Sequence, residues 1–140
     1  MVIKNSIPVK KPKKLPELCV PASNLNVLKY AIAYGADAVY IGGGKYNLRT
    51  FGDNFTVSEL QQGVDFAHSH NVKVYFTLNA IISENEIEDL RDYIGKIKDI
   101  EFDAFIISDP AVMYFLKKMF SSILDKKYFL LYFLLSTLLK

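Results

Sequence analysis

The chain has 140 residues, of which 51% are hydrophobic and 23% are charged, which is typical of a globular domain rather than a disordered or collagenous chain. Its single cysteine, Cys19, excludes a disulfide framework, a four-cysteine zinc site and a self-contained iron–sulfur site. Residues 1–16 carry five lysines and no acid, whereas the remainder has 12 basic and 15 acidic residues, so the body is not a basic nucleic-acid surface.

Two strand–helix units are predicted after the basic arm, which its spaced prolines mark as flexible. A short apolar run predicts a strand at 17–20, and Ser23 is placed to cap a helix that Gly35 ends. A second strand is predicted at 38–41, and a Thr-Val-Ser-Glu capping box at Thr56 begins the next helix. We expect Cys19 to be an inert core residue, because it lies within an apolar strand.

Two further units follow. A strand is predicted at 73–77, and a capping box at Ser83 begins a helix whose acids lie early and whose lysines lie late, as the helix dipole favours. The core face of that helix is expected to hold Ile87, Leu90, Ile94 and Ile97. The fourth strand is predicted at 104–107, and Ser108-Asp109-Pro110 opens the fourth helix with proline in its first turn.

This order predicts an α/β fold with a parallel sheet covered by helices. Asp37–Ile41 is echoed by Asp103–Ile107, 66 residues later, as repeated βα units would produce. Such units fit a TIM-type barrel of eight, of which residues 17–120 supply four and hence about half. An open flavodoxin-like sheet is the alternative architecture. Residues 121–140 include the uncharged run Tyr128–Leu139, which is shorter than a membrane span and is expected to be a buried strand, a helix or a non-native terminus.

Candidate site residues lie just after the predicted strands, where ligands bind in either architecture. The long loop between Gly42 and Phe55 can approach an anion with its glycine backbone, while two basic side chains pair with phosphate or carboxylate. A tight turn followed by a solvated loop explains the loop equally well, and neither the P-loop nor the dinucleotide fingerprint matches. The expected substrate-binding residues are Gly42, Gly43, Gly44, Lys45, Arg49 and Ser108.

Two polar residues after later strands are the catalytic candidates. Asn79 can orient a substrate through its amide, or form a turn. Asp109 can act as a general base or bind a hydroxyl, or cap the fourth helix. His68 and His70 face different directions on a helix and are expected at its end, so no metal site is predicted.

The ordered strand ends resemble a known family. Glu17–Asn24 is similar to an E-L-x-x-P-A-G-N opening, with Ser23 in place of glycine. The series continues through Gly35–Gly43, Leu48-Arg49, Asn54-Phe55, Lys73–Asn79 and Asp103–Pro110. Over about residues 17–116 it is similar to the start of the collagenase-like peptidases, number thirty-two of the peptidase families of unknown catalytic type (U).

The resemblance implies a βα barrel at the start of a longer chain, and a peptidase label without settled catalytic residues. One branch of the family instead hydroxylates bases of tRNA or rRNA, or the ubiquinone ring, with an iron–sulfur cluster held by cysteines that this chain lacks. The likeness stops near Phe120, and Leu135-Ser136-Thr137 resembles a remnant of a following strand. We therefore expect a truncated or frame-interrupted gene product.

Three functional hypotheses remain open from the sequence. The first is a fragment of a peptidase of unsettled mechanism, and the second is a fragment of the hydroxylating branch. The third is an inactive half-barrel that self-associates through its open sheet edges and Tyr128–Leu139. The expected substrate is a peptide or RNA, with no DNA, no cofactor held by this chain, a cytoplasmic location and no membrane anchor. Whether the chain is an enzyme by itself stays open.

Overall fold

The computed structural model describes residues 15–48, 54–119 and 129–131, in which strands and helices alternate. Most of the predicted basic arm, together with Arg49 and most of the apolar segment after residue 120, lies outside these ranges. The elements are β1 (Cys19–Pro21), α1 (Leu25–Ala33), β2 (Ala38–Gly42), α2 (Val57–Ser69), β3 (Lys73–Leu78), the 3-10 turn η1 (Glu84–Glu86), α3 (Ile87–Ile97), β4 (Ala104–Ile107), α4 (Pro110–Met119) and β5 (Phe129–Leu131).

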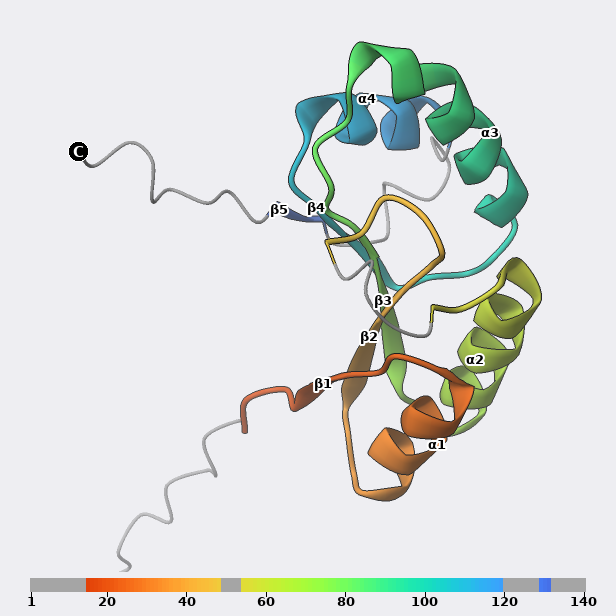
Figure 1. Cartoon of the computed structure of the whole chain (residues 1–140). Coiled ribbons are helices and arrows are strands. Elements are labelled where there is room, and N and C mark those ends of the chain that lie inside the picture. The colour runs from red at the N-terminus through yellow and green to blue at the C-terminus, as the bar shows by residue number, and fades with distance from the viewer. Residues whose placement is uncertain (1–14, 49–53, 120–128, 132–140) are drawn as a thin grey trace, which may run out of the picture.

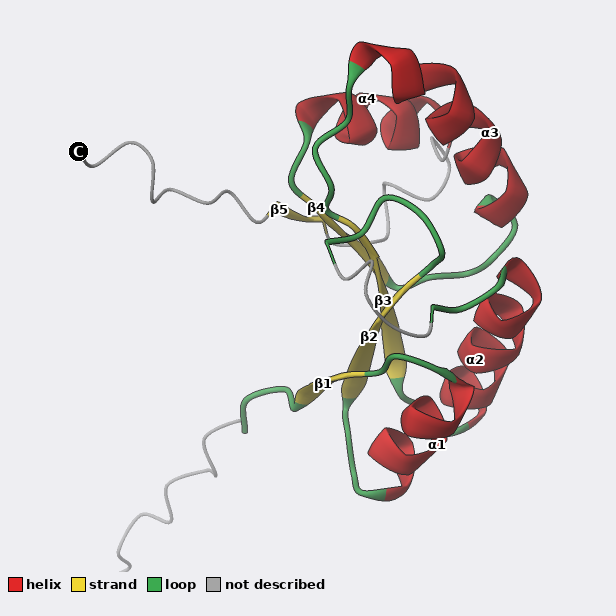
Figure 2. Cartoon of the chain, in the orientation of Figure 1, coloured by secondary structure: helices red, strands yellow, loops and turns green. Residues whose placement is uncertain are grey.

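The strands form one parallel sheet in the order β1-β2-β3-β4-β5, so each strand pairs with its neighbour in sequence. Figures 1 and 2 show the helices gathered on one side of this sheet. Right-handed crossovers in a constant direction place every helix on the same face. The alternative of a flavodoxin-like sheet is therefore wrong, because that fold has the order 2-1-3-4-5.

The caps that define the helices were only partly predicted. The capping box at Thr56 is confirmed, and Gly35 ends α1 with a φ of +93°. The cap of α1 is Asn24, not Ser23: Asn24 has an extended backbone, and its Oδ1 accepts from the Val27 amide at 3.0 Å. The Ser83 box exists but begins η1, which leads into α3. Local side chains thus cap the starts of α1, α2 and η1.

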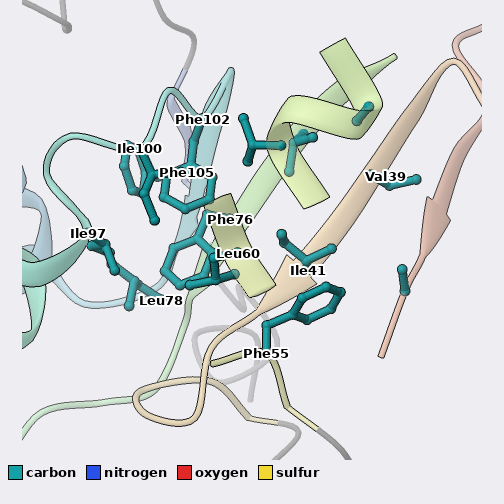
Figure 3. Close-up of a cluster of buried hydrophobic side chains, with 14 of the residues drawn as sticks. Val39, Ile41, Phe55, Leu60, Phe76, Leu78, Ile97, Ile100, Phe102 and Phe105 are labelled. Carbon is teal, nitrogen blue, oxygen red and sulfur yellow. The ribbon is translucent and has the colours of Figure 1, made fainter. Parts of the chain in front are cut away.

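The core lies between the sheet and the helices, with aromatic rings at its centre (Figure 3). The Phe76 and Phe102 rings stack with centroids 4.5 Å apart, and Phe105 meets both edge-on. Val39, Ile41, Leu78 and Ile107 extend this cluster along the helix-covered face of the sheet. This packing holds the carboxyl ends of β2, β3 and β4 side by side.

Cys19 was expected in the core, and this prediction is wrong. It lies exposed on β1, because β1 is an edge strand and Cys19 faces away from the helices, two residues before the likewise exposed Pro21. Partial burial, and then the negative charge of Glu17, raise the pKa of its thiol. A raised pKa keeps the thiol protonated and weakly nucleophilic, so its expected low reactivity has a different cause.

No helix in the part of the chain that the structure describes is long and apolar enough to cross a bilayer.

Candidate functional site

Three loops meet at the edge of the sheet where the parallel strands end. They follow β2, β3 and β4, and they hold the described site residues except Gly42, which is the last residue of β2. Arg49 lies outside the described residues, so its position adds nothing to the site. The placed candidates are Gly42, Gly43, Gly44, Lys45, Asn79, Ser108 and Asp109.

Two of the three glycines make room for side chains of the protein. A Cβ atom on Gly42 would lie 2.9 Å from Thr77 Oγ1, and one on Gly43 would lie 1.8 Å from the Tyr93 hydroxyl oxygen. A Cβ atom on Gly44 would meet nothing within 4 Å. Close packing therefore requires glycine at the first two positions, whereas Gly44 alone leaves its backbone open to a ligand.

Lys45 and Tyr46 both bind the carboxylate of Asp89, in the first turn of α3. Lys45 Nζ lies 2.6 and 2.8 Å from the two carboxylate oxygens, and the Tyr46 hydroxyl donates to Oδ2. These hydrogen bonds hold the pKa of Asp89 below its usual range, while burial and then Asp89 raise the pKa of Tyr46. The amine expected to pair with a ligand anion therefore already has an anionic partner.

Tyr46 adopts a left-handed backbone conformation, with φ of 61°. For a non-glycine residue this costs roughly 1–2 kcal/mol. The Lys45–Asp89 pair is half-exposed, so solvent weakens it, and the hydrogen bond from the Tyr46 hydroxyl to Asp89 acts on the strained residue itself.

Asn79 connects the loop after β3 to the loop after β2. Its Oδ1 accepts from the Leu48 amide at 3.0 Å, and the neighbouring Ala80 amide donates to the Tyr46 carbonyl at 3.1 Å. Because Oδ1 is the acceptor, Nδ2 is the other end of the amide, and it has no hydrogen-bond partner among the described residues. Asn79 thus orients a loop and retains two donors for a ligand.

Asp109 connects the loop after β3 to the start of α4. Its Oδ1 accepts from the Ala111 amide at 2.7 Å, and its Oδ2 accepts from the Ile82 amide at 2.8 Å. The capping role that the sequence left open is therefore present. The neighbouring Ser108 is half-buried, and its hydroxyl has no partner among the residues that the structure places.

Sequence reasoning missed two side chains of α3 that face this edge. Asp89 is 44 residues from Lys45, and no local pattern pairs them. Tyr93 lies on the flank of the predicted core stripe, and 92% of it is buried. Its hydroxyl is a buried polar group without a partner in the described parts of the chain, and burial raises its pKa to about 12.

The two histidines lie away from this edge. His68 Nε2 is 2.8 Å from Asp103 Oδ2, before the start of β4, and His70 is the C-cap of α2, so both are at the helix end as expected. The described residues contain no group of three histidine, cysteine or acidic side chains that could hold a metal ion. The site loops offer hydrogen-bond donors at Asn79 and Ser108, whereas the serine–histidine contact of the described residues, Ser69 Oγ to His70 Nδ1 at 3.0 Å, lies at the end of α2.

Comparison with known proteins gives a family for this arrangement. A family model described as peptidase family U32 matches residues 23–124. The "tRNA hydroxylation protein P1" of Bacillus subtilis is 43% identical over 100 residues, which are 71% of this chain and 24% of that protein. The "uncharacterized protease MJ0090" of Methanocaldococcus jannaschii is 42% identical over 97 residues, which are 69% of this chain and 24% of that protein.

A solved structure, that of the U32 peptidase Mk0906, has the same fold. The TM-score is 0.57 at 16% sequence identity, and the match covers 76% of this chain and 46% of the other. Identity this low supports the fold alone. The chain spans about a quarter of the length of the two curated relatives described above.

Proposed function

This chain belongs to peptidase family U32, and we propose that it is the substrate-facing part of an RNA-hydroxylating member of that family. The likeness to the tRNA hydroxylation protein carries this proposal, because that protein is 43% identical over 100 residues, which are 71% of this chain. The described residues place both histidines at the C-terminal end of α2, where His70 Nδ1 lies 3.0 Å from Ser69 Oγ, away from the three site loops. Relatives named as tRNA hydroxylation proteins or as an rRNA 5-hydroxycytidine synthase favour the hydroxylating alternative over the peptidase reading.

We also propose that the sheet is about half of an eight-stranded βα barrel. The sequential strand order and the helices on one side support this, because a closed barrel has both features. In a barrel the other face of the sheet points inward, where Tyr40 and Tyr75 stand opposite each other in register and half-buried. The three site loops would then line the mouth, where barrel enzymes bind substrates.

The chemistry of RNA suits the side chains at this edge. Asn79 Nδ2 can donate to a base carbonyl, and the Ser108 hydroxyl can donate or accept beside it. Lys45 would have to exchange its Asp89 partner to meet a phosphate, and the open backbone of Gly44 beside it gives such an anion access to the loop. Gly42 and Gly43 pack against side chains of the protein, and Arg49 stays a predicted phosphate contact outside the described residues. Asp109 positions the loops through its two backbone contacts. A cytoplasmic location follows from such a substrate.

The iron–sulfur cluster implied by the resemblance does not fit this chain. Cluster ligation uses several thiolates, and the sequence contains Cys19 alone. Cys19 is on β1 with a thiol of raised pKa, and the described residues form no metal-binding group around it. Ligands for such a cluster would have to come from outside residues 1–140, and no step of the reaction is assigned to it.

A chimera tests the function directly. Residues 17–116 would replace the matching quarter of the Bacillus subtilis protein, in a strain that lacks its own tRNA hydroxylation proteins. Mass spectrometry of digested tRNA should then detect hydroxylated nucleosides, and the unsubstituted relative serves as the positive control. A folded chimera that leaves tRNA unmodified would refute the proposal.

The peptidase reading remains the second candidate, supported by the name of the Methanocaldococcus jannaschii relative. The same purified chimera should be incubated with denatured collagen and casein. Cleavage that persists in an Asn79→Ala, Asp109→Ala double variant is attributed to a contaminant. Cleavage lost in that variant would favour the peptidase.

A further inference from the structure

Helix α3 presents two side chains to the loop that follows β2. Asp89 and Tyr93 are four residues apart and therefore lie on the same face of the helix. Asp89 binds Lys45 and Tyr46, and the Tyr93 hydroxyl lies where a Cβ atom of Gly43 would be. One helix face thus contacts both ends of the segment 43–46.

The loop is held in a conformation that is unfavourable by itself. Tyr46 is left-handed at φ of 61°, and such residues persist only where their surroundings hold them. The loop also covers the Tyr93 hydroxyl, which has no partner in the described part of the chain. A small outward movement of the loop would relieve the backbone strain at Tyr46 and would let water reach the Tyr93 hydroxyl.

The side chain that opposes this movement is Asp89. It contacts two consecutive residues of the loop, and one of them is the strained Tyr46. Two further hydrogen bonds cross this edge. The Leu48 amide donates to Asn79 Oδ1 and the Ala80 amide donates to the Tyr46 carbonyl, and both form only when the loop is already in place. Asp89 is the negatively charged group among these contacts, and it lies on α3 and not on the strands or their loops.

We propose that Asp89 is a positioning residue of the candidate site, which holds residues 43–48 across the ends of β2 and β3 with Tyr46 in its left-handed conformation. The inference rests on the proposed function in one respect, namely that this loop lies where the substrate binds. Asp89 sets the direction of the Lys45 amine and, through the Tyr46 carbonyl and the Leu48 amide, the orientation of Asn79. A residue distant in sequence therefore determines the geometry of the site.

Amide hydrogen exchange on the 140-residue chain tests this inference without RNA or activity. In Asp89→Asn, exchange at the Leu48 and Ala80 amides should rise roughly three- to tenfold, because an exposed ionic contact of modest strength is lost. The Val74 amide, bonded to Asp103 near the start of β3, is the reference and should not change. Trypsin should cut faster after Lys45, whose amine is released.

Two variants complete the design. Glu88→Gln removes a neighbouring carboxylate that pairs with Arg91 instead, and it should leave the loop protected. Asp89→Glu keeps the charge and should restore at least part of the protection. The inference is overturned if the exchange rates of the Leu48 and Ala80 amides are unchanged in Asp89→Asn, or if Glu88→Gln raises them equally. It is also overturned if the Val74 amide exchanges faster by the same factor as Leu48 and Ala80.

If the exchange rates change as expected but the chimera does not hydroxylate tRNA, the proposed function is refuted and the role of Asp89 in the loop stands.

Discussion

Asp37 and Asp103 perform the same task at the starts of β2 and β4. The Asp37 carboxylate accepts from the Leu18 amide at 2.8 Å, and its own amide donates to the Leu18 carbonyl at 2.9 Å. Asp103 makes the same two bonds with Val74, at 2.8 and 2.9 Å. The register is the same in both places. Leu18 precedes Cys19, which pairs with Ala38, and Val74 precedes Tyr75, which pairs with Ala104. The sequence echo between the two segments is therefore a structural repeat.

Removal of these carboxylates should destabilise the chain unequally. Asp103→Ala leaves the half-buried His68 ring and the Val74 amide without an acceptor, and it should lower the free energy of unfolding by about 2 kcal/mol. Asp37→Ala removes one more exposed contact and should cost about 1 kcal/mol. Urea unfolding followed by circular dichroism measures both. Equal losses would show that the His68 contact contributes nothing.

The contact between Gly43 and Tyr93 predicts a coupled pair of substitutions. Gly43→Ala places a methyl group against the Tyr93 hydroxyl and should destabilise by about 2 kcal/mol, as overpacking does. Tyr93→Phe removes a hydroxyl without a partner in the described residues and should be neutral or stabilising. In the double variant the nearest atom is 3.1 Å away, so much of the loss should return.

Gly44→Ala is the matched control for this pair, because its added Cβ atom meets nothing within 4 Å. Urea midpoints of the parent chain, the two single variants and the double variant form a double-mutant cycle. Strict additivity of Gly43→Ala and Tyr93→Phe would contradict the close approach of these two residues.

The capping box of α2 predicts a loss of stability in acid. Hydrogen bonds from the Thr56 backbone and side chain lower the pKa of Glu59 below its ordinary 4.5. A carboxylate with a lowered folded-state pKa stabilises the fold above its unfolded pKa, and this contribution disappears as the pH falls through the folded value. Urea midpoints measured from pH 6 downward should therefore depend less on pH, below about 4.5, in Glu59→Gln than in the parent chain.

Glu84→Gln provides the comparison, because the Glu84 side chain is exposed and has no hydrogen bond among the described residues. It should keep the pH dependence of the parent chain. The same flattening in both variants would assign the effect to net charge and not to the capping box.

The sequence predicted what depends on local patterns. The strands and helices follow from apolar periodicity and capping residues, so their positions needed only small corrections, such as the cap at Asn24. The exposure of Cys19 could not be predicted, because it depends on β1 being an edge strand. The pairing of Lys45 with Asp89 also escaped prediction, since an ion pair between distant segments leaves no periodic signal.

The helix cap at Asn24 can be tested against the residue that the sequence indicated. Asn24→Ala removes the side-chain acceptor of the Val27 amide and should cost about 1 kcal/mol. Ser23→Ala should have little effect, because the Ser23 side chain makes no contact of this kind in the described residues. Thermal unfolding of both variants measures these losses. A larger loss of stability in Ser23→Ala than in Asn24→Ala would show that Ser23 is the cap.

Asn79 has two separable roles, which two substitutions distinguish. Asn79→Asp keeps an oxygen to accept from the Leu48 amide but replaces the Nδ2 donors, whereas Asn79→Ala removes both. Hydrogen exchange at Leu48 should therefore rise in the alanine variant and stay near the parent rate in the aspartate variant. If the amide donates to a base carbonyl, tRNA hydroxylation by the chimera should fall roughly ten- to a hundredfold in both variants. Full hydroxylation by Asn79→Asp would leave Asn79 as a residue that only positions the loop, and the substrate donor would have to be sought at Ser108.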